Sequence, residues 1–176
     1  MRYLMLEMET NFSDLVSGGF WVGRGKSLLR NRSNPILGEG MEFYLWGTFK
    51  PLQRLIIEPK YSYQNLYYPD EADFPDEYDA TPEEIAALAG TEIFSGYILR
   101  TRINYQFTRE FFLRIIVQYN EFNESFDFDQ LLTYRINPFS AFYLGSSHDF
   151  HDYAGDAGIR QTDRTYFFKF QYLFNM

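Results

Sequence analysis

The chain of 176 residues contains no cysteine and only two histidines. Without cysteine it can hold no disulfide, no thiolate-bound zinc and no thiol nucleophile. It also lacks any apolar run of about 18 residues, which excludes a transmembrane helix. Basic residues are the minority, 16 against 24 acidic ones, for a net charge of −8. Nucleic-acid binding needs a basic face for phosphates, so this balance argues against a nucleic-acid partner.

The acidic excess belongs to one segment. Eight acidic and no basic residues lie between Tyr67 and Gly90, and removing them from the 24 leaves 16, which balance the 16 basic ones. Such a run is typically a solvated loop; a calcium site is the alternative, although the spacing does not match an EF-hand loop. Thr81 as N-cap and Pro82 at the first helical position predict a short helix inside it. A basic loop at 24–34 is expected on the same side, where it would attract the acidic one.

Aromatic residues are abundant: 19 Phe, 15 Tyr and 2 Trp make up 20% of the chain. They recur at every second position, as Tyr166, Phe168 and Phe170 do around Phe167 and Lys169. Strict alternation of this kind predicts strands and not helices. Nine strands are expected, at residues 2–12, 15–23, 40–50, 54–65, 92–106, 110–122, 126–136, 139–148 and 162–174.

Most of these strands are longer than the roughly 5–6 residues of an average strand, and they match the roughly 9–11 residues of a tilted membrane-spanning one. Aromatic residues cluster near the strand ends, as they do in the girdles at both bilayer interfaces. Short turns alternate with longer loops at 24–39, 66–91 and 149–161, with a short exception at 123–125. We therefore predict an all-β fold, an antiparallel transmembrane β-barrel in the cell outer membrane. Residues 66–91 would form its long acidic extracellular loop, in a single barrel segment spanning residues 1–176.

The number of strands is odd, whereas single-chain bacterial barrels normally have an even number with both ends in the periplasm. No signal-peptide pattern precedes the first strand. Open sheet edges in lipid would leave backbone groups unpaired, which is costly. We therefore expect this chain to be the C-terminal part of a larger barrel, with the remaining strands encoded upstream of Met1.

The C-terminal half carries a resemblance. Residues 131–145 read LLTYRINPFSAFYLG, residues 162–174 read TDRTYFFKFQYLF, and residues 98–109 read ILRTRINYQFTR. Together they resemble the C-terminal β-barrel domain, of unknown function, of Gram-negative outer-membrane proteins with an N-terminal carbohydrate-binding domain of the family-9 type. The resemblance covers roughly residues 92–176. It implies as partners outer-membrane lipid, the upstream strands and carbohydrate-binding domain of the same protein, and a carbohydrate. That domain lies outside this chain, so no sugar-binding residue is carried over.

The inward strand faces are expected to carry charges of both signs. This fits a polar lumen with structural ion pairs across strands, or a selectivity lining for a solute. The expected lumen-lining residues are Arg54, Glu58, Lys60, Arg100, Arg102, Arg114, Asp127, Asp129, Arg135 and Lys169, and the same face carries Glu7, Glu9, Glu42 and Lys50.

A second cluster lies in residues 146–152, which are expected at a strand end and in the loop that follows. Its weak candidate metal ligands are His148, His151, Asp149 and Asp152. A surface hydrolase is an alternative, but adjacent residues rarely assemble a triad. We therefore predict no catalytic residue, no cofactor and no enzyme activity. The expected function is solute passage or carbohydrate handling at the cell surface, and the rival class is a soluble lipocalin-like ligand-binding barrel.

Overall fold

A computed structural model describes residues 3–29, 36–75, 78–153 and 158–172. Nine strands form one antiparallel sheet in which every strand pairs with its neighbours in sequence. The expected all-β class and the number of strands are therefore confirmed. The strands are β1 (Tyr3–Ser13), β2 (Val16–Leu29), β3 (Ile36–Leu52), β4 (Leu55–Tyr67), β5 (Glu92–Gln106), β6 (Phe111–Asn120), β7 (Ser125–Asn137), β8 (Ser140–Tyr153) and β9 (Gly158–Tyr172).

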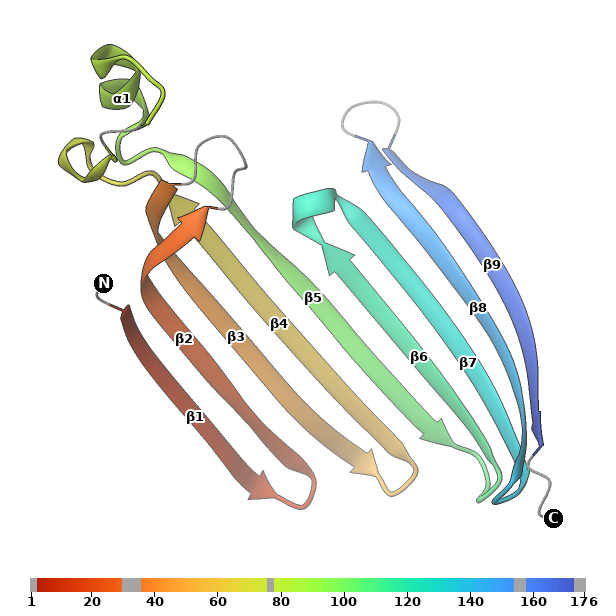
Figure 1. The fold of residues 1–176 in the computed structure, drawn as a ribbon. Helices are drawn as coiled ribbons and strands as arrows, with labels where there is room; N and C mark the ends of the chain where they lie inside the picture. The colour runs from red at the N-terminus through yellow and green to blue at the C-terminus, as the bar shows by residue number, and fades with distance from the viewer. Residues whose placement is uncertain (1–2, 30–35, 76–77, 154–157, 173–176) are drawn as a thin grey trace.

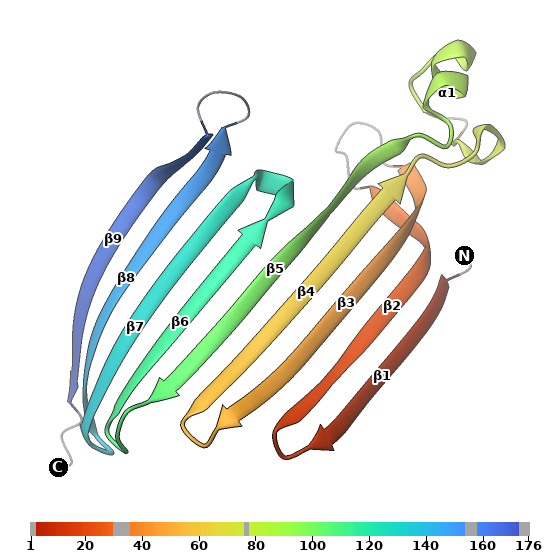
Figure 2. The ribbon, with the colours of Figure 1, turned by 180° about the vertical axis from the view of Figure 1, so that it is seen from behind.

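The sheet curves into an open trough (Figures 1 and 2), with β1 and β9 at its two edges, unpaired with each other. Figure 1 looks into the concave face and Figure 2 onto the convex face. The connections after β1, β3, β5 and β7 lie at one end of the strands, here called the turn end. The other connections lie at the opposite end, here called the loop end. Strand β1 starts at the loop end and β9 finishes at the turn end, so these two strands run in the same direction.

The predicted short turns are confirmed. Strand pairing continues to Ser13 opposite Val16 and to Asn137 opposite Ser140, which leaves only two residues in each turn. The Ser13 hydroxyl accepts the backbone N–H of Val16 at 3.2 Å, and the Asn137 side chain accepts that of Phe139 at 2.8 Å. These side chains satisfy turn donors that no strand partner reaches.

Two predicted long loops were wrong at their edges. Strands β2 and β3 stay paired to Leu29 opposite Ile36, and β8 continues through residues 149–153. Glycines such as Gly25, which faces Gly40, interrupt the pattern of side chains but not the backbone ladder. The alternation of apolar and polar residues therefore ends earlier along the chain than the hydrogen-bonded pairing of the strands. Among these connections only the one between β4 and β5 stays long.

The sheet is a single layer with almost no core. Among the described residues, the buried apolar side chains are Leu66, Ala141 and Pro69. Leu4, Phe12 and Phe168 are 76%, 74% and 65% exposed. Large contiguous apolar surfaces are rare on soluble monomers. The structure therefore presents a large exposed apolar surface.

The long connection carries the predicted helix, α1 (Pro82–Leu88), together with a 3₁₀ turn, η1 (Glu71–Asp73). Thr81 caps α1: its hydroxyl accepts the Glu84 N–H at 3.3 Å, and its own N–H donates to the Glu84 carboxylate at 2.8 Å. Lys26 Nζ lies 2.5 Å from Asp73 Oδ2, so β2 holds the acidic segment by the attraction that the charges predicted. Among the described residues no helix is long and apolar enough to cross a membrane.

Candidate functional site: the charged concave face

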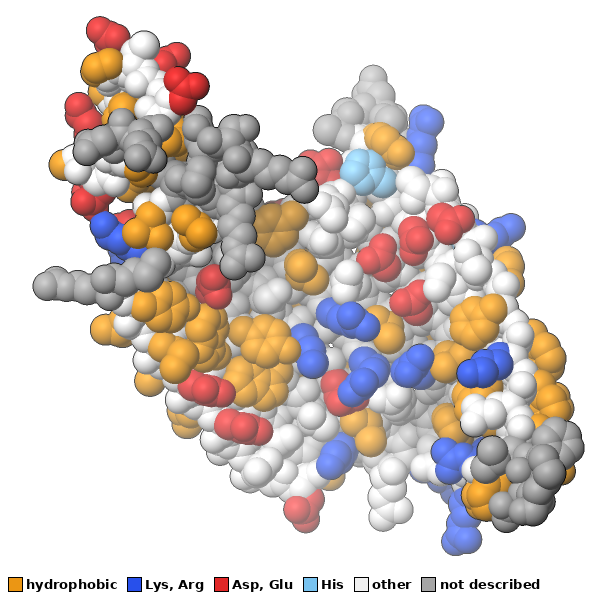
Figure 3. Space-filling model, viewed as in Figure 1, with side chains coloured by type: hydrophobic (Ala, Val, Ile, Leu, Met, Phe, Trp, Pro, Cys, Tyr) orange, Lys and Arg blue, Asp and Glu red, His pale blue; other side chains and the backbone are white. Residues whose placement is uncertain are grey.

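Strand register decides which side chains share a face. Lys60 on β4 pairs with Arg100 on β5, and both side chains lie on one face of the sheet. Ile57 pairs with Ile103, and because these positions differ from Lys60 and Arg100 by an odd number of residues, their side chains lie on the opposite face. The space-filling view into the concave face shows that charged side chains of both signs gather in its middle (Figure 3). The predicted sorting of charged residues to one face is therefore visible in the register.

Two rows of directly paired residues, here called row A and row B, cross this face from β4 to β9. On each strand the residue of row B lies two positions closer to the turn end than the residue of row A. Row A consists of Lys60, Arg100, Gln118, Asp127, Asp149 and Asp163. Row B consists of Glu58, Arg102, Ile116, Asp129, Ser147 and Thr165.

Row B contains the ion pair of this face. Arg102 donates two hydrogen bonds to Glu58, from Nε to Oε2 and from Nη2 to Oε1, both at 2.7 Å. Asn104 adds a third donor to Glu58 at 3.0 Å. A bidentate arginine–carboxylate pair of this kind fixes geometry as well as charge. Glu58 is thus fully engaged and neutralises a single arginine.

Apart from this ion pair, the cationic and anionic side chains in the middle of the concave face form two separate groups. Lys60, Arg100 and Arg114, here called the basic group, have no carboxylate within 4.0 Å in the described parts of the chain. The acidic group lies on β7 to β9, and two of its members accept hydrogen bonds from neutral donors: Gln118 donates to Asp127 at 3.1 Å and Ser147 to Asp129 at 2.5 Å. Figure 3 shows Lys and Arg side chains in one patch of this face and Asp and Glu side chains in a neighbouring one. The acidic group consists of Asp127, Asp129, Asp149 and Asp163.

The remaining predicted lumen residues lie nearer the turn end. Arg54 is in the turn before β4 and donates to the Phe107 carbonyl at 3.1 Å. Arg135 lies over the Phe112 ring at 5.2 Å, and Lys169 over the Tyr143 ring at 5.7 Å. Cation–π contacts such as these hold a cation without a carboxylate. A depression of about 290 Å³ is lined there by side chains that include Arg54, Arg109 and Arg135.

Sequence reasoning missed two charged members of row A as lumen residues. Asp149 is predicted only as a loop residue and weak metal ligand, and Asp163 only as part of the last strand. Once β8 and β9 are paired in register, Asp149 lies opposite Asp127, and Asp163 lies opposite Asp149. The signal that would have found them is the alignment between strands, which alternation within one strand does not contain.

The four weak metal candidates do not converge. Strand alternation puts Asp149 and His151 on the concave face, and His148 and Asp152 on the convex face. The prediction that they lie at a strand end and in a loop was wrong, because β8 continues to Tyr153. Among the described residues there is no group of three side chains suited to a metal ion, which also covers the described part of the acidic connection.

Ser146 and His148 do share the convex face, where a surface hydrolase would need them. Gln161 Nε2 lies 3.1 Å from His148 Nδ1 and also donates to the Asp163 carbonyl at 3.2 Å. In a catalytic triad a carboxylate lies beside Nδ1 of the histidine. Here the side chain beside Nδ1 of His148 is the Gln161 amide and not a carboxylate.

The convex face carries two aromatic belts with an aliphatic band between them. Ring contacts connect neighbours within each belt, such as Tyr97 to Tyr119 at 5.8 Å and Phe142 to Phe170 at 4.6 Å. The loop-end belt consists of Phe43, Tyr61, Tyr97, Tyr119, Phe126 and Phe150. The turn-end belt consists of Tyr105, Phe107, Phe111, Tyr134, Phe142 and Phe170. Between them lie the aliphatic residues Ile57, Ile103, Leu113, Ile115, Leu132 and Leu144. The same band also holds Thr101, Phe128, Gln130, Ser146, His148, Arg164 and Tyr166, so it is mainly aliphatic on β4 to β6 and mixed on β7 to β9.

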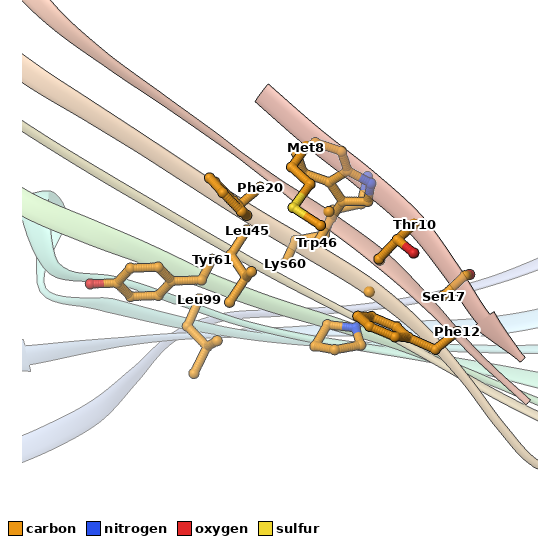
Figure 4. A pocket seen from close by; sticks show the side chains of 14 residues that line it. Met8, Thr10, Phe12, Ser17, Phe20, Leu45, Trp46, Lys60, Tyr61 and Leu99 are labelled. Atoms are coloured by element: carbon orange, nitrogen blue, oxygen red, sulfur yellow. The ribbon is translucent and has the colours of Figure 1, made fainter. Parts of the chain in front are cut away.

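The convex face is also hollowed. A depression of about 420 Å³ crosses β1 to β5, and Figure 4 shows the side chains that line it, Phe12, Phe20 and Leu45 among them. Gly18 and Gly47 face each other across β2 and β3 at its floor. Two glycines opposite each other leave no side chains to fill this position, so the hollow follows directly from the sequence.

Comparisons with known proteins do not assign a family to this chain. A scan against protein-family models, a search of curated proteins and a search of solved structures each found no match. The resemblance of residues 92–176 to an outer-membrane barrel domain therefore stays a prediction.

Proposed function

We propose that this chain is a wall segment of an outer-membrane β-barrel, with its convex face against lipid and its concave face lining a polar passage for solutes. The observation that carries the proposal is the division of one single-layer sheet into a largely apolar convex face, with Gln130, Ser146, His148 and Arg164 as polar exceptions on β7 to β9, and a concave face with charges of both signs in its middle. The apolar face has no protein layer over it among the described residues. Lipid supplies the apolar surrounding that such a face requires.

The spacing of the two aromatic belts supports a bilayer. On β6, Phe111 and Tyr119 are eight residues apart, about 27 Å along a strand at roughly 3.4 Å per residue. A strand tilt of about 35–45° reduces this to a height of about 20 Å, close to the apolar band of roughly 25 Å on membrane barrels. Aromatic residues at both borders of an aliphatic band are the girdles expected there.

The rival class is a soluble lipocalin-like barrel. Such a barrel keeps apolar side chains inside, around a ligand or core, and polar side chains outside in water. This sheet has the opposite arrangement, because Lys60 and Arg102 are on the concave side and Ile103 and Ile115 on the convex side. The inversion favours the membrane class.

Strand direction bears on how the barrel would close. Because β1 and β9 run in the same direction, direct closure between them would form a parallel pair in an otherwise antiparallel sheet. An odd number of additional antiparallel strands would join the two edges without this exception. We therefore include in the proposal that further strands of a longer polypeptide complete the barrel. We also include carbohydrate among the solutes that pass, because the barrel proteins that residues 92–176 resemble carry a carbohydrate-binding domain.

Detergent dependence and location test the proposal. The chain with its natural upstream coding sequence is expected to fractionate with outer membranes, to need detergent for solubility and to conduct ions in planar bilayers. Sugar flux into vesicles tests the carbohydrate part separately. A protein that purifies without detergent would reject the membrane class. A stop codon directly upstream of Met1 would reject the additional upstream strands alone.

A further inference from the structure

The charges of row A are sorted along the row instead of mixed. Lys60 and Arg100 stand at its β4–β5 end, Gln118 is in the middle, and three aspartates follow on β7 to β9. Row B adds Asp129 on the acidic side. Because Glu58 neutralises Arg102, the net positive charge on the other side belongs to the basic group. Rows A and B therefore hold opposite charges on neighbouring regions of the concave face, with the uncharged β6 positions of both rows between them. Two arginines of this face lie outside the two rows: Arg160 on β9, opposite His151, and Arg114 on β6, which lines a depression together with Asp129.

Sorting of this kind is unfavourable for the sheet. Asp149 lies directly between Asp127 and Asp163, and Lys60 lies directly opposite Arg100. Like charges directly opposite each other destabilise a sheet, whereas opposite charges stabilise it. The same side chains interleaved would give favourable pairs and an equally polar wall. The separation therefore points to a role for the field between the two groups.

We infer that the concave face binds and orients small solutes that carry an anionic group at one end and a cationic group at the other. The carboxylate of such a solute would pair with the basic group, where arginine offers bidentate donors, and its ammonium would pair with the acidic group. Arg100 on β5 and Asp127 on β7 are two strand spacings apart, roughly 10 Å. An extended tripeptide with free termini spans up to about 10 Å, so short peptides fit this class. The inference rests on the proposed function only in treating the concave face as open to solutes.

The field can be mapped with single thiols, because the chain has no cysteine of its own. Ser62→Cys places a thiol on the concave face two residues from Lys60, and Ser147→Cys places one in row B beside Asp129. Ser146→Cys is the matched control, since it is adjacent to Ser147 but on the convex face. Rates with a cationic and an anionic methanethiosulfonate would be measured on the full folded chain in a non-ionic detergent. Each ratio would be divided by that of the same variant unfolded in urea.

The two concave thiols should have opposite preferences. The Ser62→Cys thiol should favour the anionic reagent by about three- to tenfold, and the Ser147→Cys thiol the cationic one by a similar factor, given two or three unit charges nearby in a partly screened setting. Both preferences should vanish in about 1 M salt, where the screening length is about 3 Å. The Ser146→Cys ratio should equal its unfolded value. Equal ratios at the two concave positions would overturn the inference.

Charge reversal and protection complete the test. Arg100→Glu should invert the preference at Ser62→Cys and leave that at Ser147→Cys within about twofold. Triglycine with free termini should slow both concave thiols, whereas the same peptide with both ends blocked, and sucrose, should not. Protection by sucrose or the blocked peptide as strong as by triglycine, or no protection by triglycine, would overturn the solute class. A chain that needs no detergent yet keeps the opposite preferences would reject the proposed membrane role and leave this inference standing.

Discussion

The concave and convex faces are built by the same nine strands, and adjacent residues on one strand point to faces with different chemical surroundings. On β6, Ile115 lies on the convex face, between Ile103 and Gln130, whereas Ile116 lies in row B on the concave face, between Arg102 and Asp129. On the convex face the type of side chain matters more than its exact position, because nearly any apolar side chain suits an apolar surrounding. The concave face is defined by position, because each charge has a particular neighbour across the strands.

The difference teaches that two kinds of constraint act on alternate residues. Apolar burial is roughly proportional to area and has no direction, so convex positions tolerate exchange among apolar residues. Charge interactions depend on separation and sign, so concave positions do not tolerate exchange between signs. A sheet without a core shows this contrast directly, since packing between layers does not obscure it.

The largest effect is expected from placing one charge on each face of β6. Ile115→Lys puts an ammonium into the aliphatic band and should lower the free energy of unfolding in lipid vesicles by about 2–4 kcal/mol, the cost of lysine at a bilayer midplane. Ile116→Lys puts the same group beside Asp129 and should cost less than about 1 kcal/mol. Denaturant titration of both variants in vesicles gives the comparison. Equal losses would contradict the assignment of the two faces.

The next effect concerns two glycines that face each other on the convex side. A Cβ on Gly18 would lie 2.6 Å from the Trp46 carbonyl oxygen and 3.2 Å from the Gly47 Cα. Both are backbone atoms, so Gly18→Ala should cost about 1–3 kcal/mol, as overpacking does. A Cβ on Gly47 would meet nothing closer than 3.6 Å, and Gly47→Ala should be close to neutral. The denaturation midpoints of the two variants test this, and a Gly47→Ala loss as large as that of Gly18→Ala would show that the register between β2 and β3 is wrong.

A smaller effect is expected from the ion pair on the concave face. Side chains of Arg102 and Glu58 are 47% and 21% exposed, so solvent screens their attraction. A double-mutant cycle with Arg102→Gln and Glu58→Gln should give a coupling energy of about 1 kcal/mol, at the upper end for exposed pairs, because the contact is bidentate. Coupling should fall when salt is raised. A coupling near zero would mean that the pair contributes only geometry.

Sequence reasoning reached the strands and faces but not the rows. Alternation placed Lys60 and Arg100 on the inner face because period two is a property of each strand alone. It did not place Asp149 next to Asp127, because register arises between strands, and a slip of one residue moves every side chain to the other face. It also ended β8 too early at residue 148, where polar residues replace apolar ones while the hydrogen-bond ladder continues. The site could therefore be listed by residue but not arranged.

The smallest effect separates the loop from both faces. Hydrogen bonds from the Thr81 N–H and hydroxyl lower the pKa of the Glu84 carboxyl, so the carboxylate form is favoured in the capped helix. Because the folded pKa is the lower one, the capping contribution is fully present above the unfolded value of about 4.3 and is lost as pH falls through the folded value. Amide protection factors in α1, which correct the exchange rate for its intrinsic pH dependence, should therefore fall on acidification while those in β5 and β6 do not. Glu84→Gln should remove this pH dependence, and Glu83→Gln, which removes the same charge from the same turn without touching Thr81, should keep it. If both variants lose it equally, general charge in the first turn and not the capping box orders this helix.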